Sequence, residues 1–402
     1  MAPDEWKAGL TASARYENIE RIASAITAGC PGRADTAQQE AFKLESQAFD
    51  VSPTRQDYDQ ACLAASQPSL PPPEQCPALS HPFHHDPTPG LTIGHYTNCV
   101  ELDEGITSTV YRSPATAATA DLLSPERGYA LKLIHHHPPE PHNPTREIKT
   151  LQSCSGHATI IPLLETFHDG ENHLVLVFPL KPLTLSQLLD AGGPLPDPQV
   201  SRITRDVLSA LEYIHERGIV HRDLKPSAVL LDGPDGPAYL SDFGTVWHPE
   251  FSPPSEPADS KILDIGTGPY RPPDALMGNK SYSTPIDIWS LGVLLSELAS
   301  LSPHPTPIFS SPPTHEDGSQ LGLILSIFRT LGTPTLETWP EAAAFRTSPF
   351  GMWRVFEAQE GAFDGVSGTF RELVVGMLKY ESGQRLTAKQ ALEHKCLSHE
   401  QK

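Results

Sequence analysis

Two short segments of the chain carry carboxylates beside cations. His221-Arg-Asp-Leu-Lys-Pro226 supplies Asp223 and Lys225, and Ser241-Asp-Phe-Gly244 supplies Asp242. Phosphoryl transfer needs one carboxylate near the attacking hydroxyl, a second on Mg²⁺, and cations on the phosphates. Asp223 suits the first role, Asp242 suits the second, and Lys225 can steady the transferring phosphoryl group. Chance rarely produces both motifs in this order, so the pattern indicates phosphoryl-transfer chemistry.

Residues upstream of these motifs extend the pattern to a family. Lys132 lies in Ala130-Leu-Lys132, and Glu147 lies in Arg146-Glu-Ile148. With them, the segment from about Thr92 to Leu397 resembles the eukaryotic protein kinases. The resemblance implies ATP and Mg²⁺ as cofactors. It also implies that Lys132 holds the α- and β-phosphates and that Glu147, on a helix, pairs with it.

Further motifs resemble the cyclin-dependent kinase group. Ile327-Phe-Arg-Thr-Leu-Gly-Thr-Pro334 is followed by Trp339-Pro340, and Thr145-Arg-Glu-Ile148 partly matches the cyclin-contacting helix of that group. The resemblance implies a protein substrate with a serine or threonine acceptor, and a cyclin-dependent kinase is one candidate substrate. Because the helix match is partial, it leaves open whether a cyclin binds.

The same resemblance places an adenine pocket. Phe178 falls at the gatekeeper position, and the Pro179 carbonyl and the Lys181 backbone N–H could pair with adenine, since neither needs a side chain. The other residues implied for ATP binding are Leu102, Gly105, Val110, Ala130, Lys132 and Leu230.

Two further matches concern the architecture around the motifs. Pro272-Pro-Asp274 lies where the family has Ala-Pro-Glu, and Arg385 could form a buried pair with Asp274. Asp287-Ile-Trp-Ser-Leu-Gly292 matches the helix that anchors the catalytic loop.

One departure from the family pattern affects metal binding. The catalytic loop of the family ends in an asparagine that binds a second Mg²⁺, and this chain has Ala228 there. A methyl group cannot ligate a hard cation. We therefore expect weakened metal binding, with Asp242 as the remaining metal ligand.

Two more departures concern loops. Asp103-Glu-Gly-Ile-Thr-Ser108 keeps only Gly105 of the three glycines, and Asp103 would place an anion near the phosphates unless it points to solvent. Counting back from Thr267 puts Ile262 at the usual phosphothreonine position, so Arg222 would meet no phosphate there. The chain thus resembles fungal single-subunit kinases that activate cyclin-dependent kinases, which share a poor glycine loop and need no loop phosphorylation.

The elements that must position these residues follow from periodicity. Tyr129–Ile134 and Leu174–Phe178 read as strands, whereas Val200–His215 and Ile286–Ala299 read as helices. A strand-rich lobe over about 92–183 followed by a helical lobe predicts an α+β fold. In the terms of the family it is the bilobal kinase fold, with a cleft between the lobes.

The residues before 92 form a separate region. We expect a three-helix bundle over 1–67, a proline-rich linker over 68–91 and the kinase domain over 92–398. The third helix would begin at Ser52-Pro53 and bury Tyr58, Cys62 and Ala65. The motifs of 1–67 resemble a KIX-type domain of a fungal Mediator subunit, which implies an activation-domain helix or Mediator as a partner.

Composition limits the remaining classes. The chain of 402 residues has a net charge of −20, which argues against nucleic acid as a partner because phosphates would be repelled. No stretch approaches the apolar length of a membrane span. None of the six cysteines lies in a C-x-x-C pair, so we expect no zinc site, and we expect the nucleus or the cytoplasm as the location.

Three functional readings remain open at this point. The first is an active serine/threonine kinase carried by Asp223, Lys225, Lys132, Glu147 and Asp242. The second is a pseudokinase scaffold, in which Ala228 and Asp103 prevent efficient catalysis. The third makes the N-terminal bundle the main function.

Overall fold

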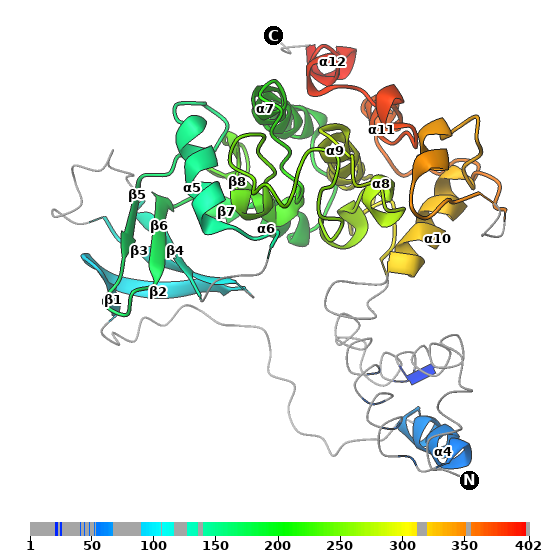
Figure 1. Cartoon of the computed structure of the whole chain (residues 1–402), viewed down its shortest axis with the longest axis horizontal. Helices are drawn as coiled ribbons and strands as arrows, with labels where there is room; N and C mark the ends of the chain where they lie inside the picture. The colour runs from blue at the N-terminus through cyan, green and yellow to red at the C-terminus, as the bar shows by residue number, and fades with distance from the viewer. Residues whose placement is uncertain are drawn as a thin grey trace. The chain divides into compact units, whose positions relative to one another are not determined.

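The computed structural model describes residues 54–66, 90–105, 107–115, 127–135, 140–311, 320–350 and 355–398, with isolated positions between 21 and 52 (Figure 1). The chain divides into two units. One comprises 1–86 with 312–319, and the other comprises 87–311 with 320–402. Among the described residues, no helix is both long and apolar enough to cross a membrane.

In the N-terminal unit, α4 (Arg55–Ala65) is the predicted third helix. It begins later than expected, because the side chain of Thr54, rather than Ser52, accepts a hydrogen bond from the N–H of Asp57. Tyr58 and Cys62 are buried on one face of α4. The positions buried with them are Ile22, Ala41 and Ala48. Most residues of the two earlier helices lie outside the described residues, so the three-helix bundle stays a prediction.

The second unit begins with an antiparallel sheet of six strands in the order β1-β2-β3-β4-β6-β5. The strands are β1 (Leu91–Ile93), β2 (Tyr96–Glu104), β3 (Ser108–Ser113), β4 (Tyr129–Ile134), β5 (Glu165–His168) and β6 (Leu174–Pro179). One helix, α5 (Pro144–Ser153), lies between β4 and β5 in sequence. Alternate residues of the central strands are buried, notably Tyr129, Leu131, Val175 and Val177, and they form the core of this lobe.

The rest of the unit is helical, with a small sheet of β7 (Leu183–Thr184), β8 (Val229–Leu231) and β9 (Ala238–Leu240). Its helices are α6 (Leu185–Asp190), α7 (Asp197–His215), α8 (Pro273–Leu276), α9 (Pro285–Leu298), α10 (Gln320–Leu331), α11 (Arg371–Met377), α12 (Ala388–Leu392) and α13 (Lys395–Ser398). Figure 1 shows the strands β1–β6 gathered at one end of this unit and α7–α12 toward the other.

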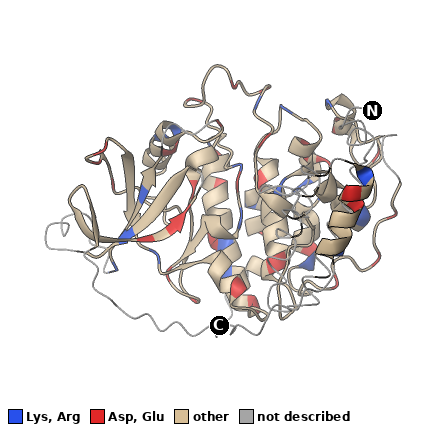
Figure 2. Cartoon of the chain, turned by 90° about the horizontal axis from the view of Figure 1, so that it is seen from below, with Lys and Arg blue, Asp and Glu red and all other residues tan. Residues whose placement is uncertain are grey.

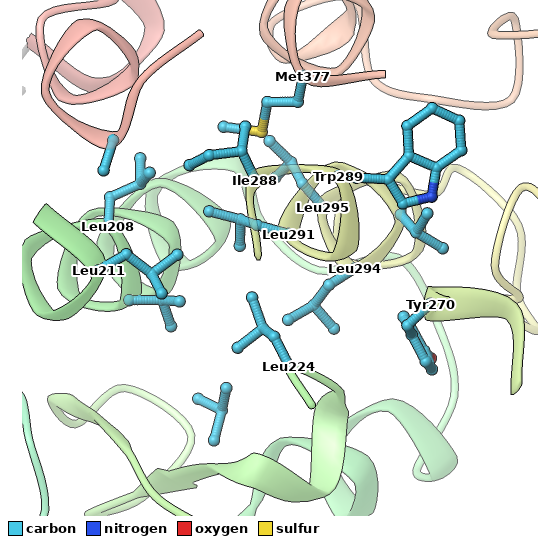
Figure 3. Close-up of a cluster of buried hydrophobic side chains, with 14 of the residues drawn as sticks. Leu208, Leu211, Leu224, Tyr270, Ile288, Trp289, Leu291, Leu294, Leu295 and Met377 are labelled. Carbon is cyan, nitrogen blue, oxygen red and sulfur yellow. The ribbon is translucent and has the colours of Figure 1, made fainter. Parts of the chain in front are cut away.

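Helix α9 is apolar on nearly all sides, which requires burial on all sides. Figure 3 shows Leu291 and Leu294 of α9 beside Leu224 of the catalytic loop, with Leu211 of α7 on one flank and Met377 of α11 above. The core of the helical lobe therefore reaches directly to the loop that carries Asp223.

The predicted α+β architecture of strand-rich and helical lobes is confirmed. The strand predicted at Tyr129–Ile134 is β4, and the predicted helices correspond to α7 and α9 within a few residues. Acidic and basic residues are interspersed over the sheet and the helices (Figure 2), so the negative net charge is not confined to one segment.

Candidate active site

The catalytic loop is fixed by a buried carboxylate of α9. The backbone N–H groups of His221 and Arg222 donate to the two oxygens of Asp287, at 2.8 and 2.9 Å, and His215 Nε2 lies 2.9 Å from Oδ2. Arg222 has a φ of 75°, a left-handed conformation that non-glycine residues seldom adopt. Burial would raise the pKa of Asp287, but the hydrogen bond and charge of His215 hold it below its usual value. The ionised carboxylate therefore holds the loop in this strained shape.

Asp223 lies where this loop meets the segment that carries Thr267. Its Oδ2 lies 2.5 Å from Lys225 Nζ, and its Oδ1 accepts a hydrogen bond of 2.7 Å from the hydroxyl of Thr267. Burial disfavours the ammonium of Lys225, but the carboxylates of Asp223 and Asp242 offset this and raise its pKa. The Thr267 contact shows that Asp223 can accept a hydrogen bond from a hydroxyl group, which is the interaction that an acceptor hydroxyl needs.

Lys132 of β4 connects the two lobes electrostatically. Its Nζ lies 2.8 Å from Glu147 Oε1 of α5 and 3.3 Å from Asp242 Oδ1. Burial disfavours the ammonium, yet the two carboxylates raise the pKa of Lys132 above its usual value. The predicted Lys132–Glu147 pair is thus formed, and the ammonium of Lys132 also lies beside the carboxylate of Asp242, the predicted metal ligand.

The N-terminus of α5 is attached to the segment that carries Asp242. The backbone N–H of Asn143 donates to the carbonyl of Gly244 at 2.9 Å, and its side chain caps α5 by accepting from Arg146 N–H at 2.9 Å. Pro144 stands at the first helical position, where its lack of an N–H costs nothing. These local contacts keep Glu147 directed at Lys132.

Asp242 is suited to hold a metal ion. Its side chain is 43% exposed, and its backbone is left-handed with a φ of 59°. Burial would raise the pKa of this carboxyl, but Lys132 and Lys225 hold it well below its usual range. Mg²⁺ commonly takes one or two protein carboxylates together with substrate phosphates. Asp242 alone therefore fits Mg²⁺, whereas Ala228 is fully buried and offers only a methyl group.

Strand register places three of the predicted adenine-binding residues, Val110, Ala130 and Phe178, on one face of the six-stranded sheet. Val110 of β3 pairs with Lys132, and Phe178 of β6 pairs with Ala130, two residues before Lys132 on the same face of β4. Leu230 is contributed by β8 of the helical lobe. All four apolar residues are half-buried. This face therefore offers an apolar surface of the kind that an adenine ring requires.

Other predicted ATP-binding residues lie at the edges of this face. Gly105 closes the β2–β3 turn, its N–H donating to the Ser108 carbonyl at 2.8 Å, and Leu102 is half exposed. Pro179 ends β6 opposite Tyr129. The ammonium of Lys181 is drawn away to Asp232, at 3.0 Å, which leaves its backbone as the part available to adenine. Asp103 is exposed, so its charge can be hydrated.

The predicted buried pair of Arg385 and Asp274 is also present. Arg385 Nη2 lies 2.7 Å from Asp274 Oδ2, and both side chains are almost completely buried. Arg385 donates further to the carbonyls of Lys379, Tyr380 and Pro285. The shorter aspartate side chain therefore still reaches its arginine.

Sequence reasoning missed the partner of Arg222. No phosphate was expected to meet Arg222 at Ile262, but the buried carboxylate of Glu256 accepts a hydrogen bond from Arg222 Nη2. Glu256 lies outside every motif. The only sequence signal is that Glu256 is one of several acidic residues between Asp242 and Asp274, which does not single it out as the partner of Arg222. The contact of Thr267 with Asp223 was missed as well, although Thr267 was recognised as a landmark.

Comparison with known proteins agrees with this geometry. Residues 100–397 match the model of the protein kinase domain family. Serine/threonine-protein kinase csk1 of Schizosaccharomyces pombe is 33% identical over 268 residues, which cover 63% of this chain and 79% of csk1. Among solved structures, the yeast RNA Pol II CTD kinase CTDK-1 complex matches with a TM-score of 0.60 and 27% identity, covering 73% of this chain and 90% of the matched chain. The chain therefore belongs to the protein kinase domain family.

Proposed function

We propose that this chain is an active serine/threonine kinase that transfers the γ-phosphate of ATP to a hydroxyl group of a protein. The observation that carries the proposal is the assembled constellation around Lys132, which contacts both Glu147 and Asp242. Both ion pairs are formed in the chain by itself. The family uses these contacts to position the nucleotide phosphates.

Each residue of the site has its own role in the transfer reaction. Asp223 accepts a hydrogen bond from the attacking hydroxyl and then its proton, while the hydroxyl oxygen bonds to the γ-phosphorus. The bond between the γ-phosphorus and its bridging oxygen breaks, and ADP leaves with that oxygen. Lys225, which already lies 2.5 Å from Asp223, offsets charge on the transferring group, and Lys132 holds the α- and β-phosphates.

Asp242 would hold Mg²⁺ beside these phosphates. When bound, the ion neutralises charge that develops on the phosphate oxygens. Ala228 removes one protein ligand, which leaves Lys132 and Lys225 as cations that can offset charge on the phosphates. The charges of both lysines act on Asp242 and hold its pKa well below its usual range.

The scaffold alternative is not favoured. A pseudokinase has no need to keep charged partners on its base and on its phosphate-binding lysine. Here Asp223 contacts Lys225, and Lys132 contacts both Glu147 and Asp242. The family match and the identity to a serine/threonine kinase point the same way.

The substrate and partners are inferred from resemblance to other proteins rather than from the geometry of the site. The resemblance to fungal single-subunit kinases that activate cyclin-dependent kinases supports a cyclin-dependent kinase as acceptor. The similarity to a yeast RNA Pol II CTD kinase offers a polymerase tail as the competing acceptor. We further propose that residues 1–67 bind an activation-domain helix and that the chain acts in the nucleus or cytoplasm.

The test is Mg²⁺-dependent transfer of γ-phosphate by the full chain. An unphosphorylated cyclin-dependent kinase, a polymerase-tail peptide and a generic basic protein serve as acceptors. Asp223→Asn should lower kcat by about 10²- to 10⁴-fold, the usual contribution of a general base. The control is Asp235→Asn, which makes the same chemical change at a carboxylate whose side chain is 89% exposed. No transfer by the parent, or equal transfer by Asp223→Asn, would contradict the proposal.

A further inference from the structure

The segment between Asp242 and Asp274, here called the activation segment, buries one carboxylate. Glu256 is 3% exposed although its neighbours in sequence are largely exposed. Its Oε1 accepts from Arg222 Nη2 and from the backbone N–H of Ile262 at 2.9 Å. Its carbonyl accepts from the indole of Trp247 at 3.1 Å. The residue is therefore held by both its side chain and its backbone.

A second arginine faces the same carboxylate. Arg146 Nη1 of α5 lies 4.0 Å from Glu256 Oε2, and the side chains of Arg146, Arg222 and Glu256 are all almost completely buried. Lys261, also buried, lies close enough for its pKa to be lowered by burial and by the charge of Arg222, with Glu256 acting in the opposite direction. Glu256 thus lies among three cations that would otherwise repel one another, and Arg146 also pairs with Glu140, at 3.0 Å.

The two arginines connect this carboxylate to the reacting groups. Arg222 immediately precedes Asp223 in the catalytic loop, and Arg146 immediately precedes Glu147 on α5. Glu256 therefore contacts the loop that holds the base and faces the helix that holds the partner of Lys132. In kinases, phosphorylation of the activation loop orders that loop through new arginine–phosphate pairs. Glu256 places a carboxylate that is part of the chain itself against one of these arginines.

The position of Ile262 supports this assignment. Counting from Thr267 places Ile262 where a phosphothreonine would stand, and its N–H donates to Glu256 Oε1. The carboxylate of Glu256, six positions earlier in the chain, thus lies at the backbone of the residue where the phosphothreonine would stand. Stability alone does not explain the arrangement, because a buried ion pair is often replaceable by apolar groups at no cost.

We propose that Glu256 is a positioning residue for the transfer reaction, which acts as a built-in anion in place of an activation-segment phosphate. It orients Asp223 through Arg222 and steadies α5 through Arg146. The chain consequently needs no phosphate on its activation segment. This inference rests on the proposed kinase function for its activity readout, but its structural readout is independent of that function.

The test compares the parent with Glu256→Gln and the matched control Glu250→Gln, an exposed position in the same segment. Glutamine keeps the size of the side chain and removes the charge. We expect kcat to fall on the order of 10- to 100-fold in Glu256→Gln, the effect of a small displacement of reacting groups, while Glu250→Gln stays at the parent value. Amide hydrogen exchange should quicken in α5 and in 246–262, but not in α9 or α11.

A second arm treats the parent with a broad-specificity protein phosphatase, and mass spectrometry verifies that the activation segment carries no phosphate. We expect the treated parent to keep its activity. Loss of activity on this treatment would overturn the proposal, as would parent-like kcat and exchange in Glu256→Gln. If the parent transfers no phosphate, the proposed function fails, and the exchange in α5 still decides the role of Glu256.

A third variant covers the case in which Glu256→Gln does not fold. Glu256→Asp keeps the charge on a shorter side chain, and it should fold with exchange in α5 closer to the parent. Failure of Glu256→Asp to fold as well would show that shape rather than charge matters at this position, and would overturn the assignment.

Discussion

A buried acid on α9 makes the stability of this kinase domain depend on pH in an unusual direction. Glu297 is 8% exposed, and its Oε2 accepts a hydrogen bond of 2.6 Å from the hydroxyl of Tyr270. The pKa of Glu297 is raised from 4.5 to about 7, chiefly by burial and also by the charge of Asp190, while the Tyr270 hydrogen bond acts in the opposite direction. The carboxyl group is therefore largely protonated in the folded chain at pH 5 to 6.

The sign and size follow by linkage. Between pH 4.5 and about 7 the folded state binds more protons at Glu297 than the unfolded state does, so the free energy of unfolding falls as the pH rises. Each pKa unit corresponds to about 1.4 kcal/mol, so the loss is roughly 3 kcal/mol and is complete above pH 7. Glu297→Gln mimics the protonated acid and lacks this loss.

The assay is urea unfolding of parent and Glu297→Gln between pH 4.5 and 8. Only the difference between the two is interpreted, since it removes the contributions of all other titrating groups. The variant should match the parent near pH 4.5 and exceed it by up to about 3 kcal/mol at pH 8. Glu250→Gln, an exposed position, should show no such trend. A difference that is independent of pH, or of opposite slope, would refute this account of Glu297.

Three further outcomes are expected. Lys132→Met should lower kcat by about 10²- to 10³-fold, measured by γ-phosphate transfer, because it removes a preorganised cation and leaves Glu147 unpaired. Ala228→Asn should lower the Mg²⁺ concentration needed for half-maximal activity by about tenfold or more. The same substitution should lower the unfolding free energy by about 1–3 kcal/mol, because it overpacks a buried site. Asp274→Asn should lower the unfolding free energy, measured in urea, by about 3–5 kcal/mol, since Arg385 loses its buried counter-charge.

Much of the fold was predictable because its signals are local. The alternation of Tyr129–Ile134 requires a half-buried strand, and the all-round apolar surface of Ile286–Ala299 requires a buried helix. The start of α4 was predicted two residues early. Ser52 and Thr54 are both competent caps, and which one meets an N–H depends on backbone angles that composition does not specify.

The catalytic residues were predictable for a different reason: their chemistry needs fixed residue types at short spacing, as in Asp223 and Lys225. Glu256 was not predictable in this way. Its contacts with Arg222 and Arg146 join segments that are 34 and 110 positions apart in sequence. The position of its carboxylate depends on the path of the activation segment, a long and proline-rich loop. Electrostatic complementarity of this kind is visible only once the chain is folded.

The hydrogen bond between Asn143 and Gly244 has a consequence for pharmacology. An inhibitor that displaces the Asp242-Phe-Gly244 triplet must break this bond, and it must also separate Lys132 from Asp242. A ligand shifts a conformational equilibrium only by as much as its differential affinity for the two states. Compounds shaped like adenine leave both contacts intact. We therefore expect this protein to bind inhibitors that leave the triplet in place more tightly than inhibitors that require the triplet to rotate.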